Sequence, residues 1–251
     1  MQAKTIKRII VTKIEEWLAT ITDERLRLDV KKNLILSGGS TTNMYLNETV
    51  NDYDIYIQDI SVLKRLVTYY IRTIYKHTKD GILYTNDDTN DMCYILDGWL
   101  SKDSLVNTLG LAGYIDKNNL DEKIGSIYSA IRTIKPNQIK MYFCGNLGYK
   151  NEKKKEDIGK YEVMYISSNS ISLSDDIQIV TRFSGTIEEI HKTFDYIHAT
   201  NYYTTKDGVV TNKEALESIL TKQLKYQGSQ YPLTSIIRMK KFIKRGWSKL
   251  S

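Results

Sequence analysis

Two aspartates and a preceding pair of glycines are the residues of this sequence whose types and spacing suit chemistry on a phosphate. Asp52 and Asp54 lie two residues apart, and eleven residues separate Asp52 from Gly38-Gly39-Ser40. In a strand, a period of two places both carboxylates on one face, about 7 Å apart. Carboxylate oxygens suit Mg²⁺. Two such ions about 4 Å apart can activate an attacking hydroxyl and stabilise a leaving pyrophosphate.

The glycine pair offers a place for the phosphates themselves. Glycine has no side chain, so the backbone at Gly38 and Gly39 can approach a triphosphate closely. Backbone amides at the start of a following helix, together with the Ser40 hydroxyl, would hold the β- and γ-phosphates. Either motif alone is common in turns and strand edges. Their order, spacing and apolar surroundings make the combination specific.

The flanking residues predict the elements that position these motifs. The apolar run from Asn33 to Ser37 predicts a buried strand that ends at Gly38, and Ser40–Leu46 predicts a short helix. Asp52–Ile57 alternates with a period of two and predicts a strand whose other face is buried. Further helices are predicted at 6–18, 62–75, 187–194, 213–226 and 233–245, with less regular helical pieces at 105–114 and 122–131.

Together, these segments resemble the signature of the DNA polymerase β-like nucleotidyltransferase superfamily. The runs Ile177–Phe183, Phe194–His198 and Arg238–Trp247 resemble an uncharacterised subgroup found in bacteriophages and large viruses. The resemblance implies an α/β (α+β) fold, with a short mixed sheet flanked by helices and a helical C-terminal part. It also implies transfer of a nucleoside monophosphate from an NTP to a hydroxyl, with Mg²⁺ or Mn²⁺ and release of pyrophosphate.

The resemblance further implies a third carboxylate on a neighbouring strand. Asp195 is the first candidate and Asp176 the second, whereas Gln178 stands where some members place an acid, which leaves an inactive family member open. The expected catalytic and metal-binding residues are Asp52, Asp54 and Asp195. The expected nucleotide-binding residues are Gly38, Gly39, Ser40, Arg182 and Arg238, with an ordinary ion pair as the alternative for each arginine. We expect His191 on a helix surface and His198 in a structural role.

The positive charge is concentrated at the end of the chain. The net charge is +6, but residues 218–251 carry eight basic residues and no acid, so the rest of the chain sums to −2. Such a cluster attracts polyanions. RNA contacts are therefore expected at Lys240, Lys241, Lys244 and Arg245, with a solvated helix face as the alternative. In the same helix, Ile236, Met239, Ile243 and Trp247 form an apolar stripe that we expect to pack on the core.

The chain organisation predicts a core at 1–205, with an insertion of unclear role at about 80–150, and a basic helical region at 206–251 packed on that core. No stretch approaches the roughly 18 apolar residues that span a membrane. Two cysteines are too few for a disulfide framework, so we expect a cytoplasmic setting, that of the host if a phage encodes the chain.

Three functions remain open. The first is nucleotidyl transfer to a nucleic acid, most simply an RNA 3′ end, which the basic tail favours. The second is nucleotidylation of a protein or small molecule, since a fold does not fix the acceptor. The third is a non-catalytic protein that keeps the fold. A P-loop NTPase and a Rossmann oxidoreductase are disfavoured, because the sequence lacks both glycine patterns.

Overall fold

The computed structural model describes residues 2–75, 77–79, 83–86, 91–97, 134–144, 148–229 and 231–249. The chain forms two compact units. Unit 1 comprises Met1–Asp59, Asp175–Ile179 and Gly185–Ser251, and unit 2 comprises Ile60–Ser174 and Val180–Ser184. The predicted insertion at about 80–150 lies in unit 2. The helical pieces predicted at 105–114 and 122–131 lie outside the described residues.

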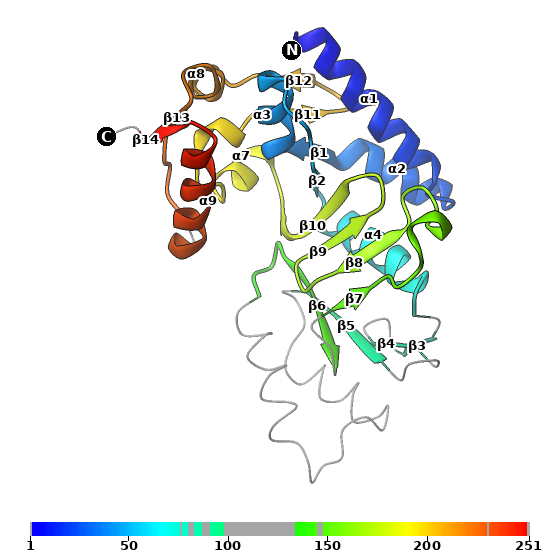
Figure 1. Ribbon diagram of the computed structural model, residues 1–251. Helices are drawn as coiled ribbons and strands as arrows, with labels where there is room; N and C mark the ends of the chain where they lie inside the picture. Colours follow the sequence, from blue (N-terminus) through cyan, green and yellow to red (C-terminus); the bar gives the residue numbers. More distant parts are fainter. Residues whose placement is uncertain are drawn as a thin grey trace. The chain divides into compact units, whose positions relative to one another are not determined.

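Unit 1 combines helices with strands, and four of these strands pair in antiparallel order (Figure 1). Strand β1 (Leu34–Ser37) pairs with β2 (Tyr53–Ile57) on one side and β11 (Tyr202–Thr204) on the other, both antiparallel. Strand β12 (Gly208–Val210) pairs with β11, and the first residues of β10 (Ile177–Ser184) lie next to β2. The other elements are α1 (Ala3–Ala19), α2 (Glu24–Asn33), α3 (Gly39–Leu46), α7 (Ile187–His191), the 3-10 helix η2 (Ile197–Ala199), α8 (Lys213–Thr221), β13 (Gln223–Leu224), α9 (Pro232–Lys244) and β14 (Ser248–Lys249).

The core of unit 1 is built from the alternating and helical patterns seen in the sequence. Every residue of β1 is buried, as are Ile55 and Ile57 of β2. Helix α1 buries one stripe, in which Ile6, Ile10 and Ile14 recur at helical spacing. Helix α2 was not predicted, although Asp23 is an N-cap signal: its carboxylate accepts the Leu26 amide hydrogen.

The predicted mixed α/β fold is confirmed, with two differences at the C-terminal end. Helix α8 stops at Thr221 because Lys222 adopts a left-handed conformation (φ 50°), after which β13 pairs in parallel with β14. The predicted apolar stripe of α9 is wrong in part, since Ile236 and Ile243 are exposed. Helix α9 meets the core through a neighbouring side that carries Ser235, Met239 and Phe242.

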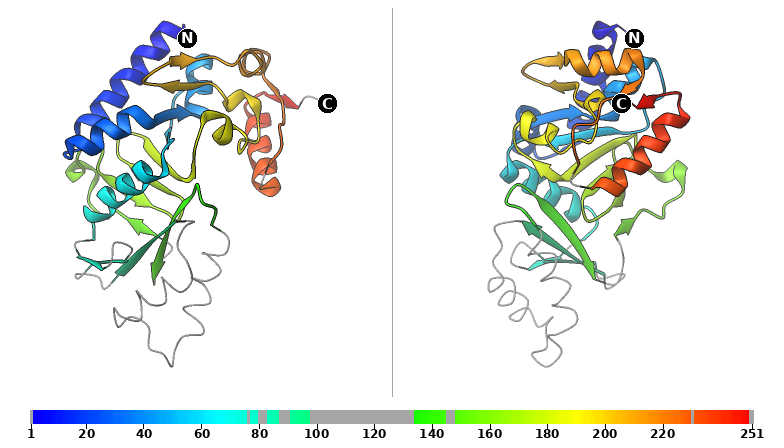
Figure 2. Two further views of the ribbon diagram at one scale, coloured as in Figure 1. Left: turned by 180° about the vertical axis from the view of Figure 1, so that it is seen from behind. Right: turned by 90° about the vertical axis from the view of Figure 1, so that its left-hand side faces the viewer.

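Unit 2 contains helix α4 (Ile60–Arg72) and two groups of strands (Figure 2). The first group is antiparallel throughout and consists of β3 (His77–Lys79), β4 (Leu83–Asn86), β5 (Asp91–Asp97) and β6 (Ile139–Cys144). The second group consists of β7 (Tyr149–Lys150), β8 (Val163–Ile166), β9 (Ser170–Leu173) and the end of β10. Among the described helices of both units, none is long and apolar enough to cross a membrane.

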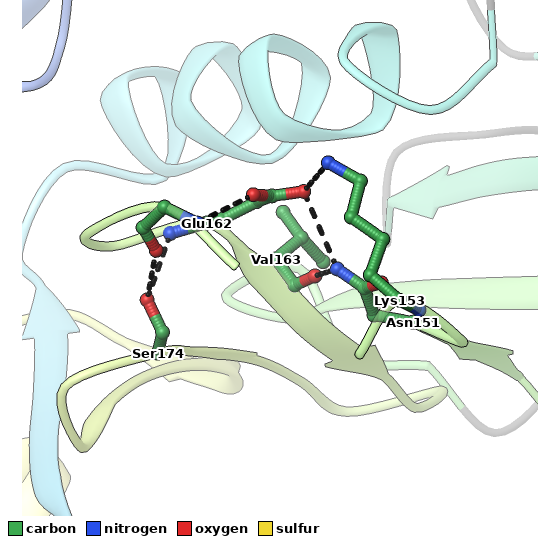
Figure 3. Close-up of polar contacts among 6 residues, drawn as sticks. Asn151, Lys153, Glu162, Val163 and Ser174 are labelled. Atoms are coloured by element: carbon green, nitrogen blue, oxygen red, sulfur yellow. Dashed lines mark hydrogen bonds and ion pairs between the residues drawn. The ribbon is translucent and has the colours of Figure 1, made fainter. Parts of the chain in front are cut away.

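The charged segment that follows β7 is tied to unit 2 by polar contacts (Figure 3). The Asn151 side-chain amide donates to the Val163 carbonyl at 2.9 Å, and the Lys153 ammonium lies 2.5 Å from a Glu162 carboxylate oxygen. The Ser174 hydroxyl accepts the Glu162 amide hydrogen at 3.1 Å. The segment includes a 3-10 helix, η1 (Lys155–Asp157). Asn151 is buried, so this charged segment is anchored at its first residue.

Candidate active site

The glycine turn and Asp54 lie in contact. Gly38 ends β1 with φ +103°, a conformation that favours glycine, and its amide donates to the Ala199 carbonyl at 3.1 Å. A Cβ atom built on Gly38 would lie 2.9 Å from Asp54 Oδ2. The antiparallel register that pairs Leu36 with Ile55 produces this contact, because it brings the start of β2 beside the end of β1. The predicted proximity of the turn and the aspartate is thus present.

The charge of Asp52 acts on Asp54. Burial, and secondarily the negative charge of Asp52, raise the pKa of the Asp54 carboxyl to about 7, while the Arg238 guanidinium opposes this rise. Asp54 is partly buried and Asp52 is exposed. Two carboxylates that repel each other next to a glycine turn form a place where a cation would be stabilised.

Asp176, the second candidate for a third carboxylate, lies near Tyr53, on the face of β2 to which the Tyr53 side chain points. After burial, the charge of Asp176 is the main cause that raises the pKa of the Tyr53 hydroxyl. The Asp176 carbonyl also accepts the Tyr53 amide hydrogen at 2.7 Å. Alternation along β2 points Tyr53 and Asp54 to opposite faces. Asp176 is therefore placed away from the carboxylate pair.

Asp195, the first candidate, is paired with a cation. Its side chain is 5% exposed, and the Arg238 guanidinium donates to Asp195 Oδ2 at 2.6 Å. Arg238 also acts electrostatically on Asp54. Within the described ranges, no three His, Cys, Asp or Glu side chains gather as a ready metal site. Asp195 as a third metal ligand stays a prediction.

Helix α3 presents its N-terminus at the same turn. Its N-cap residue is Gly38, which supplies no side-chain cap, and a Cβ built on Gly39 would meet no atom within 4 Å. The Ser40 hydroxyl is buried and has no hydrogen-bond partner in the described part of the chain. Buried polar groups are nearly always paired. An uncapped helix start with an unpaired buried hydroxyl and open space above Gly39 fits a phosphate group.

A supporting network lies directly behind the turn and was not foreseen. The Ser37 hydroxyl lies 2.9 Å from His191 Nε2 and 3.0 Å from the Asn201 carbonyl. His191 is half-buried and contacts Ser37, so it is not the surface histidine that was expected, and burial lowers its pKa to about 4. Ser37 is fully buried, which makes it a support for the end of β1 rather than a nucleophile. No sequence signal links residues 37 and 191.

Two other predicted residues have different surroundings. His198 is buried, with its ring 4.9 Å from Trp247 and 4.5 Å from Phe242, in keeping with a structural role. Arg182 belongs to unit 2, where its guanidinium lies 5.1 Å from the ring centroid of Phe183. Nucleotide binding by Arg182 stays a prediction.

The protein family follows from a comparison of the sequence with known families. Residues 8–222 match the profile of the family described as "Gad2: Gabija anti-defense 2 family protein". The chain belongs to the Gad2 family. The matched residues include the glycine turn, Asp52, Asp54 and Asp195, and they end before α9. The sequence resemblance pointed to an uncharacterised subgroup of bacteriophages and large viruses, and the family match names the Gad2 family. This family name describes action against a defence system and states no reaction.

Other comparisons add a distant structural likeness. The Gad2 chain is similar to the Thermotoga maritima CCA-adding enzyme complexed with tRNA, with 12% sequence identity and a TM-score of 0.42. The similarity covers 95% of this chain and 42% of that one, so the Gad2 chain spans less than half of the length of the solved structure. No curated protein matches the sequence.

Proposed function

We propose that this Gad2 protein is a nucleotidyltransferase that moves a nucleoside monophosphate from an NTP to a hydroxyl acceptor and releases pyrophosphate. The contact between Gly38 and the Asp54 carboxylate supports the proposal most strongly, because it sets Asp54, which senses the charge of Asp52, beside the uncapped start of α3. The unpaired Ser40 hydroxyl at that helix start adds a buried donor for a phosphate oxygen.

Each group in this arrangement has a role that its surroundings favour. Asp52 and Asp54 would hold Mg²⁺ or Mn²⁺, since Mg²⁺ is commonly bound by one or two carboxylates together with substrate phosphates. Such an ion would neutralise charge that develops on the phosphates. The α3 amides and the Ser40 hydroxyl would bind phosphate oxygens. In the same scheme, Arg238 would balance the triphosphate charge.

The Arg238–Asp195 pair favours a positioning role for Asp195. The buried carboxylate holds the guanidinium within electrostatic range of Asp54. An arginine fixed in this way loses less rotamer freedom when it binds a phosphate. One oxygen of Asp195, Oδ2, already accepts a hydrogen bond from Arg238, so we propose that Asp195 mainly orients Arg238.

The acceptor is proposed from two separate observations. The family name favours an acceptor within the Gabija defence system, a protein hydroxyl being the simplest. The basic residues Lys240, Lys241 and Lys244 favour the RNA 3′ end instead, whereas Arg245, the fourth expected RNA contact, pairs with Glu48. Both acceptors require the same site.

Transfer of label tests the proposal. The protein is incubated with Mg²⁺ or Mn²⁺ and α-labelled NTPs, together with either purified Gabija proteins or pooled RNA. We expect labelling of one acceptor class, reduced about 100-fold or more by Asp52→Asn and by Asp54→Asn. Asp176→Asn is the matched control, because it removes a carboxylate on the other face of β2 and should keep activity. Absence of label with either acceptor, or equal labelling by the Asp54 variant, would refute the proposal.

A further inference from the structure

Helix α9 is held to unit 1 by one side only. Tyr196 donates from its hydroxyl to the Ser235 carbonyl at 3.0 Å, and Arg238 pairs with Asp195. Near the end of the helix, the Arg245 guanidinium contacts Glu48 and donates to the Asn43 side chain at 2.8 Å. These contacts fix the helix in place. In Figures 1 and 2, no described element of unit 1 lies over its other side.

The opposite side of α9 exposes aliphatic residues. Leu233 and Ile237 are 78% and 69% exposed, and Ile236 and Ile243 are 46% and 48% exposed. Helical spacing places these side chains on one side, interleaved with two exposed lysines. We name this surface the α9 outer face; it consists of Leu233, Ile236, Ile237, Lys240, Ile243 and Lys244. A contiguous exposed apolar patch with a polar surround is typical of a protein-binding site.

The charge of the α9 outer face restricts its partner. The chain carries no acidic residue from 218 onward, whereas α9 carries four basic residues. Two copies of this face would bring like charges together, which disfavours a second copy of the chain. An acidic partner is favoured instead.

The aliphatic side chains of the α9 outer face favour a protein over a nucleic acid as its partner. Contacts with nucleic-acid backbones rely on basic and polar groups, and bases are stacked mainly on aromatic rings. Leucine and isoleucine gain little from either contact, but they bury well in the centre of a protein interface. We therefore propose that the α9 outer face docks an acidic protein surface with an apolar centre, and that this surface belongs to a Gabija defence protein.

Docking at this face would hold the partner near the carboxylate pair. Arg238 lies on the inner side of the same helix and acts on Asp54. If the proposed nucleotidyl transfer holds, on which this step alone rests, the docked protein is the acceptor. The helix then supplies specificity for the acceptor, while the turn at Gly38 binds the nucleotide.

Binding of purified Gabija proteins to the full chain tests the docking proposal. Leu233→Ser combined with Ile237→Ser should weaken the affinity about tenfold or more, as expected for central apolar contacts. Lys240→Glu combined with Lys244→Glu should slow association and reduce its salt dependence. Leu220→Ser is the matched control, because Leu220 is 71% exposed on α8, outside the face. All variants change exposed side chains, so their unfolding midpoints should equal that of the wild type.

Several results would overturn the docking proposal. The first is that the wild type binds no Gabija protein. The second is that the serine variant binds a Gabija protein with the same affinity as the wild type. A third is loss, in the serine variant, of binding to RNA or to anionic lipid vesicles and not to a Gabija protein. Failure of docking is distinguishable from failure of catalysis. The α9 variants should still bind NTP with Mg²⁺, whereas Asp54→Asn should dock normally and show the strongly reduced labelling given above.

Discussion

At the scale of single residues, the site depends on a glycine whose missing side chain makes room for a carboxylate. Gly38 has a positive φ, and a Cβ atom added to it would lie only 2.9 Å from Asp54 Oδ2. Gly39 is different, because a Cβ there would meet nothing within 4 Å and the residue is helical. The two neighbouring glycines are thus needed for different reasons.

We predict that Gly38→Ala lowers the free energy of unfolding by about 1–3 kcal/mol, through backbone strain and displacement of Asp54. Gly39→Ala should be close to neutral for stability, because nothing opposes the added methyl group. If the space above Gly39 holds a phosphate, the same variant should still weaken NTP binding. Urea denaturation and NTP titration of both variants check this, and equal stability losses in the two would contradict it.

His198 gives the fold a pH dependence. Burial, and secondarily the charge of Arg245, lower its pKa to about 4. In the unfolded chain, the imidazole has its ordinary pKa of about 6.5. The folded pKa lies below the unfolded value, so stability is complete above about pH 6.5 and is lost as the pH falls toward about 4.

We predict that acidification from about pH 7.5 to about pH 5 removes about 2 kcal/mol of unfolding free energy through His198 alone. His198→Leu should flatten this slope without abolishing it, since burial lowers the pKa of His191 in the same direction. Urea denaturation at the two pH values measures the difference. A slope in the variant equal to that of the wild type would show that His198 titrates normally in the fold.

At the scale of elements, α9 is anchored through an ion pair of unequal exposure. Asp195 is 5% exposed and Arg238 is 55% exposed. Removal of Arg238 leaves a buried carboxylate without its cation, which is more costly than loss of an exposed pair, although solvent at the arginine reduces the effect.

We predict that Arg238→Met costs about 1–3 kcal/mol of unfolding free energy and that Asp195→Asn recovers part of this loss in the double variant. A double-mutant cycle gives the coupling, expected at about 1 kcal/mol. Additive losses would mean that the two side chains act independently. Because Arg238 is also proposed to face the triphosphate, both single variants should weaken NTP binding.

The elements around the site were predictable because their signals are local. The run that forms β1, the glycines after it and the alternation of β2 lie within residues 34–57, and each pattern specifies its own element. The partner of Asp195 was not predictable, since Arg238 lies 43 residues away and the pairing depends on how α9 docks. The same reason explains the error in α9. Its periodicity shows that the helix is amphipathic, but contacts with Asp195 and Glu48 decide which side faces the core.

At the scale of the whole molecule, the Gad2 family and the candidate site suggest how a defence would be defeated. An inhibitor that only binds must match its target in number, whereas an enzyme acts on many targets in turn. We predict that this protein inactivates the Gabija system below a one-to-one ratio, in a manner that depends on time and on NTP. Titration of purified Gabija activity measures this ratio. Inhibition that requires equal amounts, without NTP, would indicate docking alone.

The most direct measurement of the central claim is the affinity for NTP in the presence of Mg²⁺, determined by calorimetry. The acidic pair beside the glycine turn predicts saturable binding that Mg²⁺ strengthens and that Asp52→Asn and Asp54→Asn each weaken at least tenfold, while Asp176→Asn leaves it unchanged. Absence of NTP binding in the wild type, or equal affinity in the Asp52 and Asp54 variants, would contradict the assignment of a nucleotide site to this turn.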